Sequence, residues 1–260
     1  MRAKDLLEIN RPPTMLIYGP AGTGKTAIVS QAVDGYMMDF DDGMRTALTL
    51  NDQFTPLRQS IEFDLFVDED PMAPRKYLEA KTKLLQISDD VRRGKWPYKA
   101  IVIDSLTGLC RAAQLFVLGT SGNSMRQPQI QHFGQIVNEV ESIFTILRSL
   151  KVLVLVTAHE MAVETDNGML IRIMSATKPH GMNKIPWLFD EVLYAKTRMK
   201  GGNKPNDYIV SGKSSSSIST RTRSGITSDI VINDIGLAGL LDFTKYKEHK
   251  EKEETNVVSS

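Results

Sequence analysis

Short apolar stretches separated by polar, helix-forming segments dominate the first two thirds of the chain. Residues 15–18, 36–40 and 100–103 are each short enough and apolar enough to be buried strands. Residues 151–157 form the strongest of these predicted strands, and residues 60–66, which alternate apolar and polar positions, are a further candidate. The pattern predicts a sheet whose central strands are covered on both faces.

Helical spacing of apolar residues occurs between these strands. Residues 77–91 and 130–150 carry apolar side chains at helical intervals, and residues 25–32 have a helical pattern directly after a glycine-rich segment. Alternating strands and helices are typical of parallel βαβ units. We therefore expect an α/β fold with a mostly parallel sheet flanked by helices.

The last third of the chain has a different pattern. Residues 207–210 and 218–223 are predicted to pair as a late antiparallel hairpin across the serine-rich turn at 213–217. Residues 245–260 are highly charged and then polar, which predicts a disordered tail. We expect one domain over residues 1–244, followed by this tail.

Composition narrows the function classes only slightly. The chain has 260 residues, 41% hydrophobic and 24% charged, which is enough for a core without disulfides. Its single cysteine, Cys110, favours a reducing compartment, and we expect neither a secretory leader nor a membrane span. The net charge of +1 means that any nucleic-acid binding must come from local basic patches.

The segment between the first predicted strand and its helix has the spacing Gly-x4-Gly-Lys-Thr. Such a loop turns backbone amides toward phosphate oxygens, its lysine contacts the outer phosphates, and its threonine hydroxyl coordinates Mg²⁺. The alternative is a glycine-rich turn of purely structural use. The pattern therefore predicts an ATP and Mg²⁺ site at Gly19, Pro20, Ala21, Gly22, Thr23, Gly24, Lys25, Thr26 and Ala27.

A magnesium–nucleotide site needs a second oxygen ligand from a neighbouring strand. Asp104 follows the apolar run 100–103, and strand ends of this kind meet ligands at the carboxyl edge of open α/β sheets. The alternative is that Asp104 caps the next helix. Beside a P-loop we favour the metal role for Asp104.

The position after Asp104 bears on the branch of P-loop ATPases. AAA+ enzymes place the water-activating glutamate there, whereas this chain has Ser105. The segment Asp39-Phe40-Asp41 resembles instead the acid-spacer-acid pattern that the RecA branch places after its P-loop helix. That resemblance implies Asp41 as the catalytic base, with Asp39 and Asp42 as rivals; the alternative is a polar turn at residues 42–43.

Two later features also resemble the RecA branch. His159 follows the strand at 151–157, where RecA-like ATPases place a polar sensor of the γ-phosphate. Arg221 and Arg223 resemble the basic-x-basic finger that RecA-like and DnaB-like subunits insert into a neighbour's nucleotide site. The alternatives are a hydrogen-bonded histidine at a strand end and a solvated basic strand.

Together these motifs resemble the compact RecA-core ATPases of bacteriophages that serve single-strand annealing and recombination, over about residues 10–243. The segment 186–192, Pro-x2-Phe-Asp-Glu-Val, adds to the resemblance. It implies a RecA-like core, single-stranded DNA as partner, a homo-oligomer (filament or ring), and the cytoplasm of an infected bacterium. A single-strand DNA-binding protein is a further implied partner.

RecA-like proteins bind single strands through two mobile loops. The corresponding segments here are 119–129 and 161–184, so that phosphate contacts are expected from Arg126, Arg172, Lys178 and Lys184. A ring helicase or other DNA motor is the alternative on the same fold, and a nucleotide-gated assembly factor without DNA binding is the alternative of another class.

Overall fold

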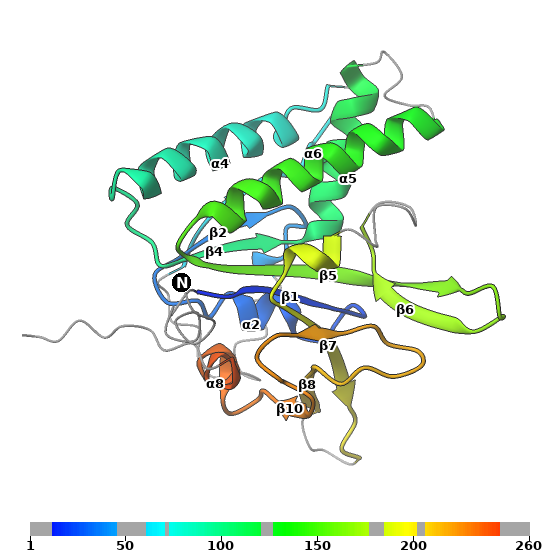
Figure 1. The fold of residues 1–260 in the computed structure, drawn as a ribbon. Helices are drawn as coiled ribbons and strands as arrows, with labels where there is room; N and C mark the ends of the chain where they lie inside the picture. Colours follow the sequence, from blue (N-terminus) through cyan, green and yellow to red (C-terminus); the bar gives the residue numbers. More distant parts are fainter. Residues whose placement is uncertain are drawn as a thin grey trace, which may run out of the picture.

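The computed structural model describes residues 12–45, 61–70, 73–120, 127–176, 185–201 and 206–244. Its strands form one ten-stranded sheet (Figure 1). The strands are β1 Thr14–Gly19, β2 Gly35–Asp39, β3 Glu62–Leu65, β4 Ala100–Asp104, β5 Leu153–Glu164, β6 Leu170–Met174, β7 Glu191–Arg198, β8 Asp207–Ser211, β9 Arg221–Thr222 and β10 Asp229–Val231. The helices are α2 Lys25–Val29, α4 Lys76–Arg92, α5 Leu106–Thr120, α6 Ile130–Ser149, the 3-10 turn η2 Ile185–Leu188 and α8 Gly236–Phe243.

The order of the main sheet is β10-β8-β7-β1-β5-β4-β2-β3. The six strands from β7 to β3 in this order run parallel, whereas β8 and β10 add to the sheet antiparallel. This confirms the expected α/β class, with a mostly parallel sheet and late antiparallel strands. The P-loop strand β1 lies between β5 and β7, so polar residues that follow several strands meet around its carboxyl end.

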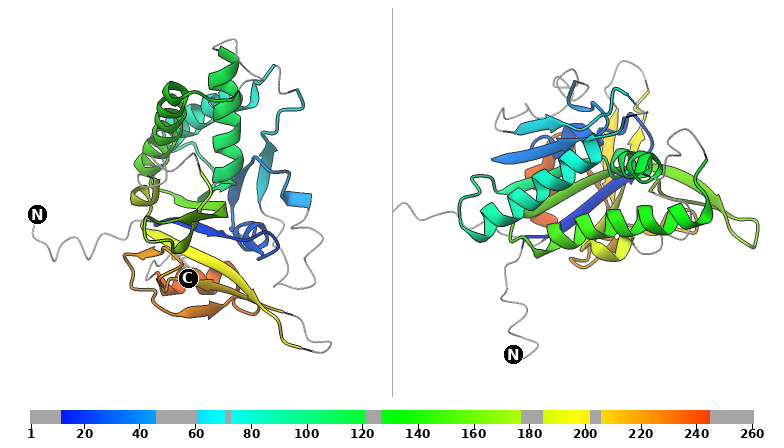
Figure 2. Two further views of the ribbon diagram at one scale, coloured as in Figure 1. Left: turned by 90° about the vertical axis from the view of Figure 1, so that its right-hand side faces the viewer. Right: turned by 90° about the horizontal axis from the view of Figure 1, so that it is seen from above.

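Apolar side chains of β1 alternate between the two faces of the sheet, as the two-residue period of a strand requires. Leu16 and Tyr18 pack with the helices α4, α5 and α6, where Phe144 is fully buried. Met15 and Ile17 pack with α2 and α8 on the other face. Figures 1 and 2 show the three long helices together on one face, with the short helices α2 and α8 on the opposite side.

Several predicted elements have different bounds or partners. The helix predicted over residues 25–32 ends at Val29. The prediction of a hairpin between residues 207–210 and 218–223 is wrong. β8 pairs with β7 and β10, and β9 pairs with β7 at Glu191 and Val192. The sequence contains several short β-prone segments here, and local pattern cannot decide which of them pair, because register depends on the whole sheet.

The strand predicted at 151–157 is also longer than expected. β5 continues to Glu164 and turns back as β6, so residues 161–174 form an antiparallel hairpin rather than a loop. The predicted tail at 245–260 lies outside the described residues. None of the helices in the described part of the chain is long and apolar enough to cross a membrane.

Candidate functional site

The P-loop lies between the carboxyl end of β1 and the start of α2. Gly22 and Gly24 have φ of 75° and 76°, a left-handed conformation that glycine adopts without the steric cost of a side chain. The Lys25 ammonium lies across the loop and donates to the carbonyl oxygens of Gly19 at 3.0 Å and Pro20 at 2.7 Å. Burial lowers the pKa of Lys25, and the nearby carboxylates of Asp104, Glu160 and Asp41 oppose this change. An anion bound in the loop would further stabilise the charged lysine.

Asp104 is placed at the end of β4 beside the P-loop and is only 2% exposed. One carboxylate oxygen accepts a hydrogen bond from the Thr157 hydroxyl, while Oδ2 is buried and has no hydrogen-bond partner among the described residues. Burial raises the pKa of Asp104 to about 6, against the effect of the nearby Thr157 and Thr26 hydroxyls. A buried carboxylate oxygen without a partner is costly unless a ligand completes it.

Gly43 shows how closely the backbone approaches this carboxylate. A Cβ at position 43 would lie 2.7 Å from Asp104 Oδ2 and 3.3 Å from Thr26 Oγ1, so any side chain would crowd both oxygens. Asp104 Oδ2 and Thr26 Oγ1 both border the space next to Gly43, and the first is buried without a hydrogen-bond partner among the described residues. These two oxygens fit an ion such as Mg²⁺, which would take its remaining ligands from phosphate and water.

The three acidic residues after β2 have separate environments. Asp39 is fully buried, and its carboxylate accepts backbone N–H groups of Asp41, Gly43 and Met44 at 3.0, 3.1 and 3.0 Å. Asp42 is half exposed, has φ of 53° and pairs with Arg45 at 3.3 Å. Asp39 thus fixes the turn, and Asp42 pairs at its outer side.

Asp41 is the acid of this group that enters the P-loop cavity. Its Oδ2 accepts the Ser105 hydroxyl at 2.5 Å and lies 3.4 Å from His159 Nε2. Burial raises the pKa of Asp41, but the contacts with His159 and Ser105 and the charge of Lys25 outweigh it and hold the pKa below its usual value. Asp41 is therefore held as an anionic carboxylate in the cavity.

Backbone contacts hold His159 in addition to the contact of its ring with Asp41. The strand register places it beside Gly19, its amide donates to Thr107 Oγ1 at 3.0 Å, and its carbonyl accepts the Ser175 amide at 2.6 Å.

Ser105, Thr107 and Thr157 were not predicted as site residues, although each follows or ends an apolar strand. A polar residue at the end of an apolar strand is the sequence signal that could have identified them as site residues.

One cavity unites most of the predicted nucleotide site. It is lined by P-loop residues 21–27 and by Asp41, Asp104, Ser105, Thr157 and His159. Asp39 and Asp42 do not line it. The structure therefore brings together Lys25, Thr26, Asp104, Asp41 and His159 from four strands and their following loops.

Comparison with known proteins identifies the family. Residues 11–224 match the AAA domain family. The chain belongs to this family of P-loop NTPase domains. Membership does not depend on a glutamate after Asp104, because this AAA domain has Ser105 there and uses its hydroxyl to contact Asp41.

Solved structures also resemble this AAA domain, at low sequence identity. A KaiC-like protein from the archaeon Pyrococcus horikoshii is 16% identical, with a TM-score of 0.45 over 85% of this chain and 89% of that chain. The flagellar accessory protein FlaH from Methanocaldococcus jannaschii is 11% identical, with a TM-score of 0.39 over 81% and 84% of the two chains. No curated protein sequence matches the chain.

Arg221 and Arg223 lie far from the P-loop of their own AAA domain. β9 pairs with the first residues of β7, and Glu191 of β7 pairs with Met15 at the amino end of β1. The P-loop begins at Gly19, at the other end of β1, which is four residues and about 13 Å away at 3.3 Å per strand residue. The Arg223 guanidinium pairs with Asp190 at 2.8 Å, and Arg221 donates to the Pro186 carbonyl at 3.4 Å.

The predicted DNA contacts are mostly outside the described part of the chain. Arg126, Lys178 and Lys184 all lie in segments that the structure does not describe. Arg172 lies on β6, where its guanidinium pairs with Glu160 at 2.8 Å. Tyr194 donates to the same glutamate at 2.7 Å, so Arg172 is already part of a network within the domain.

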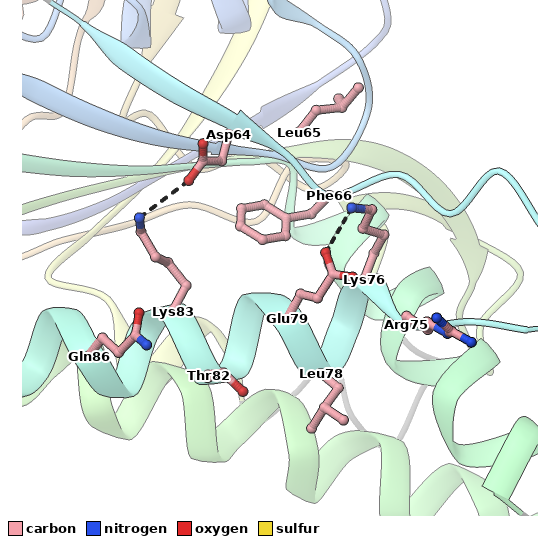
Figure 3. Close-up of a pocket in the computed structure, with 10 residues that line it drawn as sticks. All are labelled: Asp64, Leu65, Phe66, Arg75, Lys76, Leu78, Glu79, Thr82, Lys83 and Gln86. Atoms are coloured by element: carbon pink, nitrogen blue, oxygen red, sulfur yellow. Dashed lines mark hydrogen bonds and ion pairs between the residues drawn. The ribbon is translucent and has the colours of Figure 1, made fainter.

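A second hollow lies between residues 64–66 and the first half of α4, and shares no lining residue with the P-loop cavity (Figure 3). Two of its lysines are paired within it, Lys83 with Asp64 at 3.4 Å and Lys76 with Glu79 at 2.7 Å. None of the predicted site residues lines this hollow.

We predict that Asp41→Asn slows the chemical step of nucleotide hydrolysis by about 10²-fold or more, because a positioned carboxylate base contributes on that order. Nucleotide affinity should change little. Single-turnover hydrolysis and equilibrium nucleotide binding measure the two effects separately. Asp42→Asn is the matched control, and a larger loss in the control than in Asp41→Asn would refute the assignment.

We predict that Asp39→Asn acts on stability instead. The side-chain NH2 group of the new asparagine would face backbone N–H groups that donate to the carboxylate of Asp39 in the wild type. Because two donors cannot bond to each other, the free energy of unfolding should fall by about 2–4 kcal/mol. Denaturant unfolding of this variant beside Asp42→Asn, expected within about 0.5 kcal/mol of wild type, tests this. Equal stability of the two variants would contradict the structural role of Asp39.

Proposed function

We propose that this protein is a Mg²⁺-dependent ATPase that hydrolyses ATP to ADP and phosphate. The observation that carries the proposal is the unpartnered Oδ2 of Asp104, buried next to Thr26 and in the same cavity as Lys25 and Asp41. This combination provides a cation for the phosphates, oxygen ligands for a metal, and a separate carboxylate for water.

Each residue has a distinct role in the proposed reaction. The P-loop amides and Lys25 bind and orient the phosphates, and Thr26 with Asp104 would hold Mg²⁺, which neutralises phosphate charge when it is bound. Asp41 orients the attacking water and accepts its proton, held in place by Ser105. His159 contacts Asp41 and is proposed to sense the terminal phosphate at the end of β5.

We further propose that the ATPase binds single-stranded DNA and supports phage recombination, annealing or replication, as the motif resemblance implies. Arg126, Lys178 and Lys184 are the proposed phosphate contacts, with Arg172 available only if it leaves Glu160. A single-strand DNA-binding protein is a proposed additional partner. The nucleotide would act on Arg172 through His159, since β5 leads directly from the cavity to the β5–β6 hairpin.

One observation favours the second candidate, a nucleotide-gated assembly factor. The β5–β6 hairpin exposes Glu164 and Asp166, and its arginine, Arg172, is paired. An acidic hairpin repels DNA phosphates and suits a protein partner. In that function the same ATP cycle would switch protein contacts without DNA.

We propose that the active form is a homo-oligomer in which Arg221 and Arg223 act on a neighbour's nucleotide. Their position at the opposite edge of the sheet supports action between chains rather than within one. An arginine supplied in this way contributes about 10³–10⁵-fold in other P-loop enzymes.

We predict that the ATPase binds single-stranded DNA with an affinity that falls steeply as salt rises, because each phosphate contact releases counterions. Arg126→Ala or Lys184→Ala should make the log–log slope shallower by about 0.7. Fluorescence anisotropy of a labelled oligonucleotide over a salt series measures this, with the ATPase rate recorded with and without DNA.

Arg93→Ala is the matched control, because Arg93 is exposed directly after α4 and pairs only locally with Asp89 among the described residues. Its slope should equal that of wild type. Hydrolysis without any DNA binding at low salt would contradict the DNA proposal and favour the assembly factor.

A further inference from the structure

An exposed aromatic and two arginines gather at the amino edge of the sheet. Trp187, on η2, is 74% exposed, and Arg223 is exposed directly after β9. Arg221 of β9 donates to the carbonyl of Pro186, the residue before Trp187. The Leu188 and Asp190 backbones contact Thr14 at the start of β1, which fixes the position of this patch. We call Trp187, Arg221 and Arg223 the amino-edge patch.

The opposite edge carries an acidic projection. The β5–β6 hairpin extends beyond the remainder of the sheet on the right of Figure 1 and again in the view from above in Figure 2. Its tip exposes Glu164, Asp166, Met169 and Leu170, the last two to 48% and 63%. Neither acid has an ion-pair partner among the described residues. We call residues 164–170 the hairpin tip.

The base of the β5–β6 hairpin contacts β1 and β7 near their carboxyl ends. The amino-edge patch lies at the amino ends of the same two strands. Glu160 accepts the Tyr194 hydroxyl of β7 at 2.7 Å, and the Tyr18 hydroxyl of β1 donates to the Arg172 carbonyl at 3.3 Å. The patch and the tip are therefore in line along β1 and β7, at opposite ends.

The two surfaces cannot meet within one chain. Thr14 pairs with Val154, and β5 runs ten residues further to Glu164, which is about 33 Å at strand spacing. The tip also extends five residues beyond His159, about 17 Å past the level of the P-loop. A second copy seated over the nucleotide site would be flanked by the hairpin.

We propose that the amino-edge patch of one copy docks against the hairpin tip of the next, in a head-to-tail interface. The proposal rests on the oligomeric ATPase proposed above and names the surfaces that build it. Arg221 has no ion-pair partner among the described residues and complements Glu164 and Asp166, while Trp187 provides an apolar anchor for Met169 and Leu170. Tryptophan and arginine are the residues that most often dominate binding energy at interfaces.

This interface is heterologous, because each copy offers one patch and one tip. Such contacts repeat into a ring when the rotation closes and into a filament when it does not. Assembly would therefore depend on one repeated contact.

A charge exchange tests the interface. Wild type with Mg²⁺ and a non-hydrolysable ATP analogue should sediment as an oligomer. Arg221→Glu and the double variant Glu164→Lys/Asp166→Lys should each need at least a tenfold higher protein concentration to assemble. An equimolar mixture of the two variants should assemble again, because opposite charges meet wherever a patch of one variant faces a tip of the other. Trp187→Ala should weaken assembly, and Arg93→Glu is the matched control that should not.

The results distinguish a failure of this interface from a failure of the proposed ATPase function. Assembly that survives both charge variants, or a mixture that fails to recover, overturns the interface. A wild type that hydrolyses ATP as a monomer overturns it too and leaves the ATPase intact. A role of Arg221 at the nucleotide cannot imitate the result, because it explains neither the loss of assembly in the hairpin-tip variant nor the recovery in the mixture.

Discussion

A buried carboxylate with one unpartnered oxygen is the constraint around which the site is arranged. Asp104 ends β4 in the middle of the sheet, where water is excluded and an unsatisfied anion is costly. Thr157 satisfies one oxygen, and Gly43 leaves room beside the other. Asp39 holds the turn that brings Gly43 there, and the same turn directs Asp41 into the cavity. A metal held with Thr26 would complete the arrangement.

The sequence allowed the fold class and the centre of the site to be predicted because their signals are local. A buried strand, a glycine-rich loop and a following helix stand next to one another in the chain, and Asp104 directly follows its apolar run. Asp41 could not be separated from Asp39 and Asp42 in this way. What distinguishes them is the direction of each carboxylate, and that depends on the turn held by Asp39 and on Ser105, 64 residues away.

The late strands and the β5–β6 hairpin were harder to predict from the sequence for a related reason. β8 and β9 both pair with β7, and the local pattern of apolar and polar residues does not indicate either pairing. The extension of β5 past Ala158 has only intermediate and exposed positions, so it lacks the apolar run that signals a buried strand. The placement of Arg221 and Arg223 at the amino edge likewise follows from sheet order alone, and it is what makes a role between chains reasonable.

The central claim is that the P-loop cavity hydrolyses ATP, and phosphate release by Lys25→Ala tests it most directly. Turnover with Mg²⁺ should fall at least 100-fold, since the ammonium that contacts the outer phosphates is lost, a change of about 2.7 kcal/mol in activation free energy. Circular dichroism and thermal unfolding should show the fold retained. A folded Lys25→Ala protein that hydrolyses ATP within twofold of wild type would contradict the account.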